Sequence, residues 1–402
     1  MSGRSQTSDV LIVGAGILGA ATAYHLAAAG HAVVVLERGP VNREGSGTTA
    51  GNVHIQAIHA RRPGQIAPVD IGRMLPLQVM ASRYWSTIED DLERQVELRR
   101  GGGFMIAETA AEMAELRRKH ALESSAGLRT ELMDGDTARA AFPLLSPRVA
   151  MADWCDSDGY ANPLLVTGAY LDAAARHGAA VHAFTPVTSV ARQRAGYLVT
   201  AGEQQWSAPV VVNLAGPWIA SVAALTGIEI AMNPVAIQMH LTVRIPPVMD
   251  CLVQHIGHGL SVKQVAAGQV LAGGGWPART LDLGGRSVAS ADSLRGNLAL
   301  AVGILPFLSR LRLLRMWAGP LAATPDEMPV IGEVPGWPAY FLAGGTYAFT
   351  LAPLWARCLA ALIEGREPPV SLAGLSPARL MPSAPAWAAG PQPYPSGWRG
   401  RH

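Results

Sequence analysis

Three glycines, Gly14, Gly16 and Gly19, follow a short β-branched run near the start of the chain. At a turn from a strand into a helix, the first glycine of this spacing permits a tight turn and the second lets the backbone approach a pyrophosphate. The third lets the helix pack closely on the strand, while the helix N-terminus presents free N–H groups to the anion. Glu37 closes the next apolar run, where a carboxylate can bind an adenosine ribose and would repel a 2′-phosphate. The sequence therefore predicts a dinucleotide site that disfavours NADP.

A strand–helix–strand unit must position these residues. Val10–Val13 predicts a buried parallel strand, residues 17–29 an alanine-rich helix ended by Gly30, and residues 32–36 the next strand. Alternation between residues 232 and 275 predicts an antiparallel sheet. Further helices are expected at residues 73–91, 110–123, 162–177, 290–311 and 352–363, and further strands at 103–106, 181–190, 197–200, 210–214, 236–243, 270–273, 315–319 and 340–343.

These segments predict an α/β protein with a Rossmann-like, discontinuous dinucleotide-binding domain and a second, α+β domain built on an antiparallel sheet. We expect the first domain to comprise residues 1–85, 150–225 and 315–375, and the second, a substrate or cap domain, to comprise residues 86–149 and 226–314. Residues 376–402 are rich in proline, alanine and glycine, which predicts an extended or disordered tail.

Composition excludes several classes of protein. The 402 residues are 49% hydrophobic and 15% charged with a net charge of +2, which argues against a nucleic-acid partner or a disordered chain. Cys155, Cys251 and Cys358 are far apart and odd in number, so they predict neither a disulfide framework nor a metal centre. His255 and His258 are spaced like a metal-binding pair but have no third ligand close by in the sequence. We therefore expect no metal.

The N-terminal residues and the longest apolar stretch bear on where the protein is located in the cell. The first strand starts by Asp9, which leaves no room for a signal peptide, and the apolar stretch from Leu298 to Leu308 is short and interrupted by Pro306. We expect a cytoplasmic protein without a transmembrane segment.

The loop after the second strand, residues 45–52, is long and rich in hydroxyl groups and backbone donors. Such a loop suits the ribityl chain and polar ring edges of a flavin, whereas a plain NAD dehydrogenase would not need it. No second glycine fingerprint for NAD(P)H occurs, so the electrons are expected to come directly from an organic substrate.

At this point the sequence resembles the FAD-dependent amino-acid and amine oxidoreductases of the D-amino-acid oxidase, glycine oxidase and sarcosine oxidase type, over residues 8 to about 380. Six blocks carry the resemblance: the fingerprint ending at Glu37-Arg38, and residues 46–52, 211–218, 317–319, 324–332 and 344–353. Residues 239–243, 260–264 and 273–277 are most similar to the small (β) subunit of heteromeric dehydrogenases that act on opines, hydroxyproline or proline.

The resemblance implies hydride transfer from a carbon bearing an amine to flavin N5, which gives an imine that water hydrolyses. It also implies noncovalent FAD, since no cysteine near Gly319 matches the family's covalent tether, a larger α-type redox subunit as partner, and room for a second flavin shared with that partner. By motif match, the FAD-binding residues would be Gly14, Ala15, Gly16, Ile17, Leu18, Gly19, Glu37, Arg38, Ser46, Thr48, Thr49, Gly51, Asn52, Val187, Ala215, Gly216, Trp218, Gly345, Thr346, Tyr347, Phe349, Thr350 and Leu351.

The reacting end departs from the family's pattern. Gln56 stands where sarcosine oxidases have a carboxylate-binding arginine, and Leu271 aligns with their oxygen-activating lysine, which favours a dehydrogenase. The candidate catalytic residues are His54, His240, Lys263 and Tyr347, and the candidate substrate-binding residues are Gln56, His240 and Lys263. The pair Arg61 and Arg62 is expected to be solvated surface.

Two alternatives stay open. One is a stand-alone D-amino-acid or glycine-type oxidase that produces hydrogen peroxide. The other is a flavin-binding subunit without turnover that serves assembly or electron relay, an alternative that the bulky Thr346–Phe349 segment keeps open.

Overall fold

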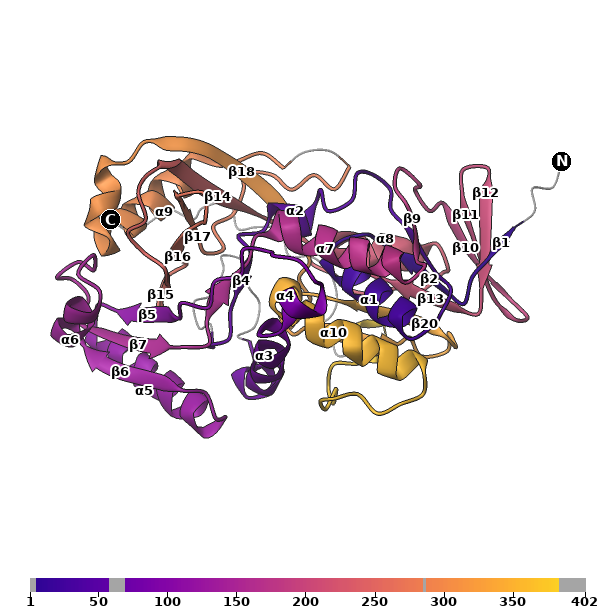
Figure 1. Cartoon of the computed structure of the whole chain (residues 1–402), viewed down its shortest axis with the longest axis horizontal. Coiled ribbons are helices and arrows are strands. Elements are labelled where there is room, and N and C mark those ends of the chain that lie inside the picture. Colours follow the sequence, from indigo (N-terminus) through magenta and orange to yellow (C-terminus); the bar gives the residue numbers. More distant parts are fainter. Residues whose placement is uncertain (1–4, 58–68, 285–286, 383–402) are drawn as a thin grey trace.

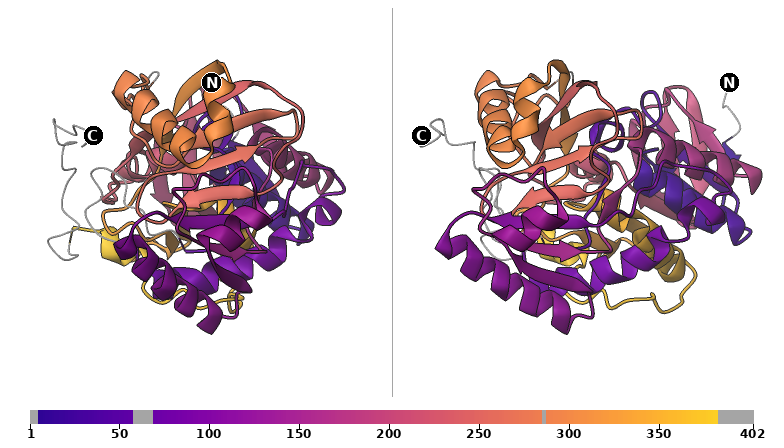
Figure 2. Two further views of the ribbon diagram at one scale, coloured as in Figure 1. Left: turned by 90° about the vertical axis from the view of Figure 1, so that its left-hand side faces the viewer. Right: turned by 60° about the vertical axis from the view of Figure 1, so that its left-hand side comes forward.

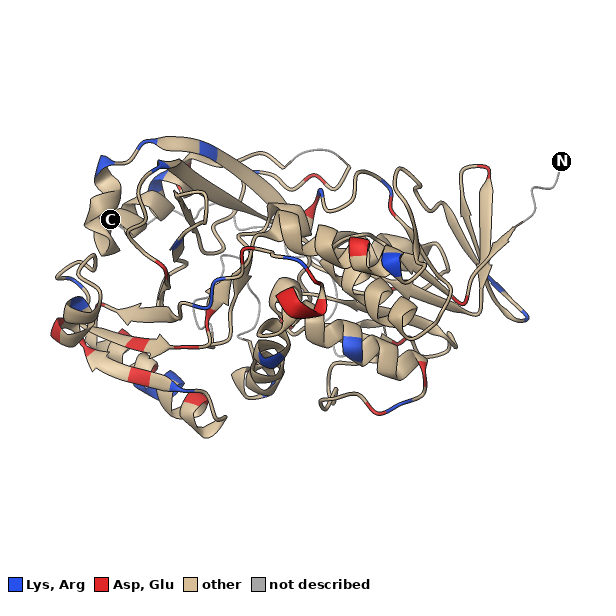
Figure 3. Ribbon diagram, viewed as in Figure 1, with Lys and Arg blue, Asp and Glu red and all other residues tan. Residues whose placement is uncertain are grey.

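The computed structural model describes residues 5–57, 69–284 and 287–382. The molecule is elongated, with one large sheet at each end of its long axis (Figure 1). Basic and acidic residues are interspersed along the ribbon (Figure 3), as the net charge of +2 suggests. No helix within the described ranges is long and apolar enough to cross a membrane.

A six-stranded sheet contains the glycine turn. Its order is β19 (Val330–Glu333), β20 (Tyr340–Gly344), β13 (Val210–Asn213), β2 (Val10–Val13), β3 (Val33–Leu36) and β9 (Ala180–His182). The strands are parallel except for β19. All four residues of β2 are buried, as expected of a central parallel strand covered on both faces.

Three long helices accompany this sheet. They are α1 (Ile17–Ala28), α7 (Pro163–Arg176) and α10 (Ala348–Ile363), with α1 packed against the other two. A small sheet lies beside the six-stranded one, in the order β1 (Gln6–Thr7), β12 (Gln204–Ala208), β11 (Gly196–Ala201) and β10 (Ser189–Gln193). The two sheets bury a common apolar cluster that includes Trp206 and Tyr340.

The opposite end is an eight-stranded sheet. Its order is β18 (Leu313–Leu321), β14 (Val235–Arg244), β17 (Gln269–Gly273), β16 (Ser261–Gln264), β15 (Leu252–His255), β5 (Gly103–Ala107), β7 (Met151–Cys155) and β6 (Thr130–Asp134). Neighbouring strands are antiparallel except for β15 and β5. The antiparallel sheet expected between residues 232 and 275 is therefore confirmed.

Helices cover both faces of the eight-stranded sheet. α9 (Ala291–Ile304), orange in Figure 2, shares an apolar cluster with Phe104 and Ile106 of β5, and α5 (Ala110–Ser125), purple, shares another with Met105 and Ala107 on the opposite face of that strand. The remaining elements are α2 (Gly45–Thr48), α3 (Ile71–Trp85), α4 (Ile88–Asp91), α6 (Gly135–Ala141), α8 (Ile219–Ala224), the two-stranded pair β4 (Asn52–Val53) and β8 (Gly159–Tyr160), and 3₁₀ turns at Gly216–Trp218, Pro306–Arg310 and Pro377–Leu380.

The α/β fold class is confirmed, and the boundaries between domains stay a prediction. Two strands bear on them. β7, which we assign to the dinucleotide-binding segment 150–225, pairs with β5 and β6 of the eight-stranded sheet, and β18, most of which lies in the segment 315–375, pairs with β14 of the same sheet.

Three expected elements differ from the structure. The strand at 181–190 is two strands in different sheets, because the chain turns at Phe184, whose φ is +54°. The helix at 73–91 is broken between α3 and α4, and the helix at 290–311 ends at Ile304, one residue before the segment Leu305–Pro306 that cannot continue it.

Within the segment expected to be an extended or disordered tail, Pro377–Leu380 forms a 3₁₀ turn, and Leu380 is buried in the same cluster as Tyr340. Residues 383–402 lie outside the described ranges. The flavin-type loop at 45–52 is also more ordered than expected, since it forms α2 and the start of β4.

Candidate active site

A cavity of about 1020 Å³ extends from the glycine turn of the six-stranded sheet to the wall of the eight-stranded sheet. Its first half is lined by the β2–α1 turn, the end of β3, α2, residues 214–218 and residues 345–350. Its second half is lined mainly by apolar groups, including Met105, Ile237, Met239 and Leu260. Large, mostly apolar cavities with a few convergent polar groups are the usual form of cofactor and substrate sites.

The glycine turn has no room for side chains. Gly14 has a φ of +107°, and a Cβ on it would lie 2.7 Å from the carbonyl oxygen of Leu214. A Cβ on Gly19 would lie 1.9 Å from the carbonyl oxygen of Gly14, so the first turn of α1 packs directly on the strand end. The spacing predicted from the sequence thus corresponds to a cradle of bare backbone at a helix N-terminus, which suits a pyrophosphate.

The acidic residue after β3 is held in place by two backbone donors. Ala15 N–H donates to Glu37 Oε2 at 2.9 Å, and Gly39 N–H donates to Glu37 Oε1 at 3.0 Å. Beside it, the Arg38 guanidinium lies 3.8 Å from the centre of the Trp218 ring. Both side chains, those of Arg38 and Trp218, donate to the carbonyl oxygen of Leu283, at 3.3 and 3.0 Å. These contacts lie at the end of the cavity that contains Glu37.

The loop after β3 is tied to the glycine turn. Ser46 Oγ accepts a hydrogen bond from Ile17 N–H at 3.0 Å, which joins α2 to the first turn of α1. The Trp317 Nε1–H donates to the carbonyl oxygen of Thr48 at 2.8 Å. A Cβ on Gly319 would lie 1.9 Å from Thr48 Oγ1, so the match of Gly319 to the family's pattern has a steric reason.

Tyr347 lies at the other side of the same cavity, where it caps the N-terminus of α10. Its φ is +66°, a left-handed conformation that is uncommon for a residue other than glycine and tends to occur at functional sites. Thr346, Phe349 and Thr350 line the cavity beside it. The N-terminus of this long helix places a positive dipole end at this side of the cavity.

Most of the predicted cofactor residues line one continuous cavity. They are Gly14, Gly16, Ile17, Leu18, Glu37, Arg38, Ser46, Thr49, Asn52, Val187, Ala215, Gly216, Trp218, Gly345, Thr346, Tyr347, Phe349 and Thr350. The others, Ala15, Gly19, Thr48, Gly51 and Leu351, are not part of the lining. Ala15 and Gly19 support the turn from behind, through the contacts given above.

The comparisons with known proteins agree with this site. Residues 9–362 match the family described as FAD dependent oxidoreductase, also called DAO. The chain belongs to this family. The bare glycine cradle, the anchored Glu37 and the long cavity all fit FAD, on which the family depends.

Individual relatives support the same assignment. Glycine oxidase of Geobacillus kaustophilus is 25% identical over 376 residues, which is 92% of this chain and 96% of the relative. The hydrogen cyanide synthase subunit HcnC of Pseudomonas aeruginosa is 25% identical, over 96% of this chain and 99% of the relative. An opine oxidase subunit of Rhizobium meliloti is 24% identical, over 86% of this chain and 90% of the relative.

A solved structure confirms the fold. The crystal structure of the Geobacillus kaustophilus glycine oxidase superposes with a TM-score of 0.83, over 92% of this chain and 98% of that chain, at 24% identity. The FAD-dependent oxidoreductase fold expected from the sequence is therefore confirmed.

His54 is the candidate catalytic residue that lies at the cavity, together with Tyr347. Burial, aided by the nearby Lys263, lowers the pKa of His54 to about 3, so the imidazole is neutral at physiological pH. Its backbone N–H donates to Thr350 Oγ1 at 3.1 Å. The side chain of Gln254 is hydrogen-bonded to the ring, which opposes the lowering of its pKa.

Lys263 does not line the cavity and lies behind the flavin-type loop. Its Nζ donates to the carbonyl oxygen of Ala50 and, at 2.7 Å, to Asn52 Oδ1. It also lies 4.5 Å from the centre of the Tyr160 ring. Burial lowers its pKa well below the usual value. The expectation that Lys263 contacts substrate therefore has no support in its position.

His240 also lies outside the cavity lining, because it faces the wrong side of β14. Its neighbours Ile237 and Met239 line the cavity, and side chains alternate between the two faces of a strand. The His240 ring is instead fully buried, 2.8 Å from Gln238 Nε2 and 2.9 Å from Asn297 Oδ1. It is a core histidine between β14 and α9.

Gln56 is likewise directed away from the cavity lining. Its Nε2 donates to Asp158 Oδ2 at 2.6 Å and to the carbonyl oxygen of Gly103 at 3.3 Å. The side chain is fully buried, so it is not placed to bind a substrate carboxylate. Arg61 and Arg62 lie outside the described residues.

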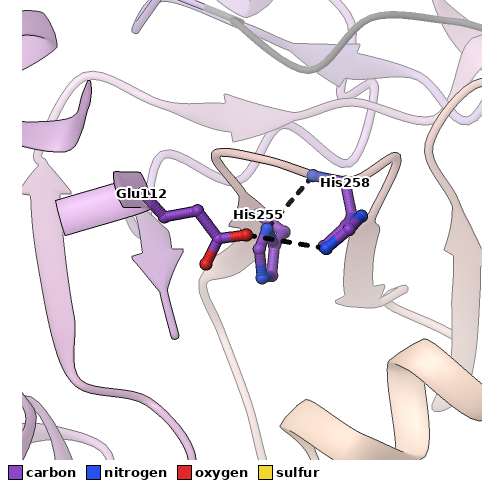
Figure 4. A group of neighbouring side chains, drawn as sticks. All are labelled: Glu112, His255 and His258. Atoms are coloured by element: carbon purple, nitrogen blue, oxygen red, sulfur yellow. Dashed lines mark hydrogen bonds and ion pairs between the residues drawn. The ribbon is translucent and has the colours of Figure 1, made fainter. Parts of the chain in front are cut away.

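The structure brings a third potential ligand, Glu112, to the two histidines considered as a metal pair (Figure 4). However, His255 Nδ1 accepts hydrogen bonds from the backbone N–H groups of Gly257 and His258, at 3.0 and 3.1 Å. The neutral ring therefore carries its proton on Nε2, which lies 3.3 Å from Glu108 Oε2. Neither nitrogen of the His255 ring offers a free lone pair, so the cluster fits a hydrogen-bonded turn better than a metal site.

Sequence reasoning missed several residues of the second half of the cavity. Gln254 lines it from β15, and the ion pair of Glu115 and Arg118 lines it from α5. These residues occur in no motif, and α5 carries charged residues on several faces, so no local signal marked them.

Proposed function

We propose that this flavoprotein oxidises a C–N bond of an amino acid, imino acid or opine, as a dehydrogenase and as the β-type subunit of a hetero-oligomer. The observation that carries the proposal is the continuous cavity that joins the glycine cradle to an apolar wall on the eight-stranded sheet. Bound FAD would supply the hydride acceptor. The apolar wall, with Met105, Met239 and Leu260, would exclude water from the reacting carbon.

The residues of the chain have separate tasks in this proposal. Glu37, Arg38 and Trp218 hold the adenosine end, and the glycine turn holds the pyrophosphate. The N-terminus of α10 at Tyr347 stabilises negative charge at the ring edge. His54 remains neutral, so it donates or accepts a hydrogen bond without acting as a cation.

Two relatives support the assembly part of the proposal, since their names describe them as subunits: HcnC and the opine oxidase subunit of Rhizobium meliloti. The glycine oxidase relative supports the alternative of a stand-alone oxidase. The choice of a dehydrogenase depends on Leu271, which aligns with the oxygen-activating lysine of sarcosine oxidases.

The test is an anaerobic titration of the purified holoprotein. D-amino acids, sarcosine, prolines and opines are mixed with it, and the flavin absorbance is followed. Bleaching by one of them supports an amine oxidoreductase, and no bleaching by any supports the non-catalytic flavin subunit. Air is then admitted: slow reoxidation with rapid reduction of an artificial acceptor supports the dehydrogenase, and rapid stoichiometric peroxide formation overturns it. Co-purification of a larger subunit tests the hetero-oligomer.

A further inference from the structure

A fully buried carboxylate, Asp158, lies behind the reacting half of the cavity. Its Oδ1 accepts hydrogen bonds from the backbone N–H groups of Ile55 and Gln56, at 2.7 and 2.9 Å. Its Oδ2 accepts from Gln56 Nε2 at 2.6 Å and from Gln254 Nε2 at 2.9 Å. Burial raises the pKa of Asp158, and the hydrogen bonds from Gln56 and Ile55 oppose that rise. All four partners are donors, which suits an ionised carboxylate and no other side chain of this size.

These bonds connect three segments that are far apart in the sequence. Residues 55 and 56 directly follow the flavin-type loop, Asp158 lies between β7 and β8, and Gln254 belongs to β15 of the eight-stranded sheet. Gln254 and His54 both line the cavity, whereas Asp158 is not part of the lining. Asp158 therefore joins the loop that carries His54 to the opposite wall of the cavity.

The orientation of the His54 ring is also determined by its neighbours. Lys263 Nζ donates to Asn52 Oδ1 at 2.7 Å, so the other amide atom of Asn52, Nδ2, is the donor. That Nδ2 lies 2.6 Å from Ser261 Oγ and 3.3 Å from His54 Nε2. His54 Nε2 therefore acts as acceptor, and the neutral ring carries its proton on Nδ1.

The side chain of Gln254 is hydrogen-bonded to the same ring and favours its protonated form. Because Gln254 Nε2 donates to Asp158, the amide oxygen of Gln254 is the atom left to accept from His54 Nδ1–H. Asp158 thus fixes the orientation of the Gln254 amide, and Gln254 fixes the tautomer of His54. Both Gln254 and His54 line the cavity.

We propose that Asp158 is a positioning residue that fixes the amide of Gln254, so that Gln254 Oε1 accepts from His54 Nδ1–H and holds this ring in place at the half of the cavity that receives the substrate. The substrate part of this inference rests on the proposed function, and the positioning part does not.

The test compares Asp158→Asn with Asp156→Asn in the holoprotein. Asp158→Asn keeps the shape but places a donor NH₂ against donors, whereas Asp156 lies in the same turn and pairs with Arg129 at the surface. The substrate is the compound that bleaches the flavin. We expect Asp158→Asn to raise KM about tenfold or more with a smaller change in kcat, as for the loss of one charge-assisted hydrogen bond, and Asp156→Asn to match the wild type.

Two further variants keep the test decisive if Asp158→Asn folds poorly. Gln254→Met removes only one of the four bonds to Asp158, and we expect it to raise KM in the same direction. Asp158→Asn/Gln254→Glu exchanges donor and acceptor, and we expect it to recover a part of the lost KM. Equal KM values for Gln254→Met and Asp156→Asn, or no recovery in a folded double variant, would overturn the proposal.

A measurement without turnover separates this inference from the proposed function. In ¹⁵N-histidine-labelled wild type, with His54 assigned by its loss in His54→Gln, we expect the Nδ1–H tautomer, and a shifted resonance in the Asp158 variant. An Nε2–H tautomer in the wild type would overturn the positioning argument even where a substrate is found. If no compound bleaches the flavin, the proposed function fails, and the tautomer still decides the positioning argument.

Discussion

Gly19→Ala is the substitution whose effect on cofactor binding the structure specifies most closely. The added Cβ would lie 1.9 Å from the carbonyl oxygen of Gly14, a backbone atom of the turn that should hold the pyrophosphate. Ordinary contacts to a Cβ begin at about 3.4 Å, so α1 and the strand end must separate by roughly 1.5 Å. The helix N-terminus would then move away from the anion.

A second helix glycine provides the matched control. Gly168 lies in α7, which packs against α1, and a Cβ on it would meet nothing within 4 Å. Alanine is a better helix former than glycine by up to about 1 kcal/mol, so Gly168→Ala should stabilise the fold slightly or leave it unchanged. Gly19→Ala has the same gain in propensity but adds an overpacking cost of about 1–3 kcal/mol. The difference between the two variants isolates the close contact.

The assay measures two quantities for both variants. The free energy of unfolding is obtained from urea denaturation of the apoprotein, and the dissociation constant of FAD from quenching of flavin fluorescence. We expect Gly19→Ala to lose about 1–2 kcal/mol of stability and at least tenfold in FAD affinity, and Gly168→Ala to lose neither. A Gly19→Ala protein that binds FAD within threefold of the wild type would refute the assignment of this turn as the pyrophosphate cradle.

Three further predictions test other parts of the molecule. Lys119→Met leaves the fully buried Glu123 and Asp153 without their cation and should cost about 3–5 kcal/mol in urea unfolding at pH 8. The loss should be smaller at pH 5, because burial raises the pKa of Glu123 to about 7 and it protonates there. The pKa of His54 is lowered to about 3, so between about pH 6.5 and pH 3 the imidazole is protonated in the unfolded state and neutral in the folded state. The free energy of unfolding should therefore fall by up to about 1.4 kcal/mol for each unit of pH decrease in this range. Urea unfolding of His54→Gln should show a shallower dependence on pH in acid. Trp218→Leu removes the ring that contacts Arg38, and it should weaken FAD binding about tenfold in a fluorescence titration. An unchanged affinity would show that Trp218 does not help to hold the adenosine end of FAD.

The half of the site that binds the nucleotide was predictable from the sequence because its chemistry is local. Gly14 has a positive φ, Gly19 packs on the carbonyl oxygen of Gly14 five residues before it, and Glu37 follows within the same strand–helix–strand unit. The α/β fold class follows from the same short-range patterns. That β7 belongs to the eight-stranded sheet was not predictable, because its pairing with β5 and β6 joins residues far apart in the chain.

Strand parity limited the prediction of the reacting half. The alternating run at β14 identified a strand, and we expected His240 of this strand to be functional. The structure instead places its neighbour Met239 at the cavity. The single-sequence pattern could not decide this, because both faces of β14 are buried, one against the cavity and one against α9.

The polar groups in the second half of the cavity are positioned by hydrogen bonds from several separate segments, which explains why no sequence motif marked them. Four donors surround Asp158, and two of them are backbone N–H groups, which any residue other than proline at positions 55 and 56 would supply. The position of His54 depends in turn on Asn52, Lys263 and Gln254, from three separate elements. Asp158 and Glu123 are both fully buried, and both accept hydrogen bonds from backbone N–H groups of the segment 55–57 that leads away from His54. The shared target indicates that these buried carboxyl groups hold this one loop against the cavity.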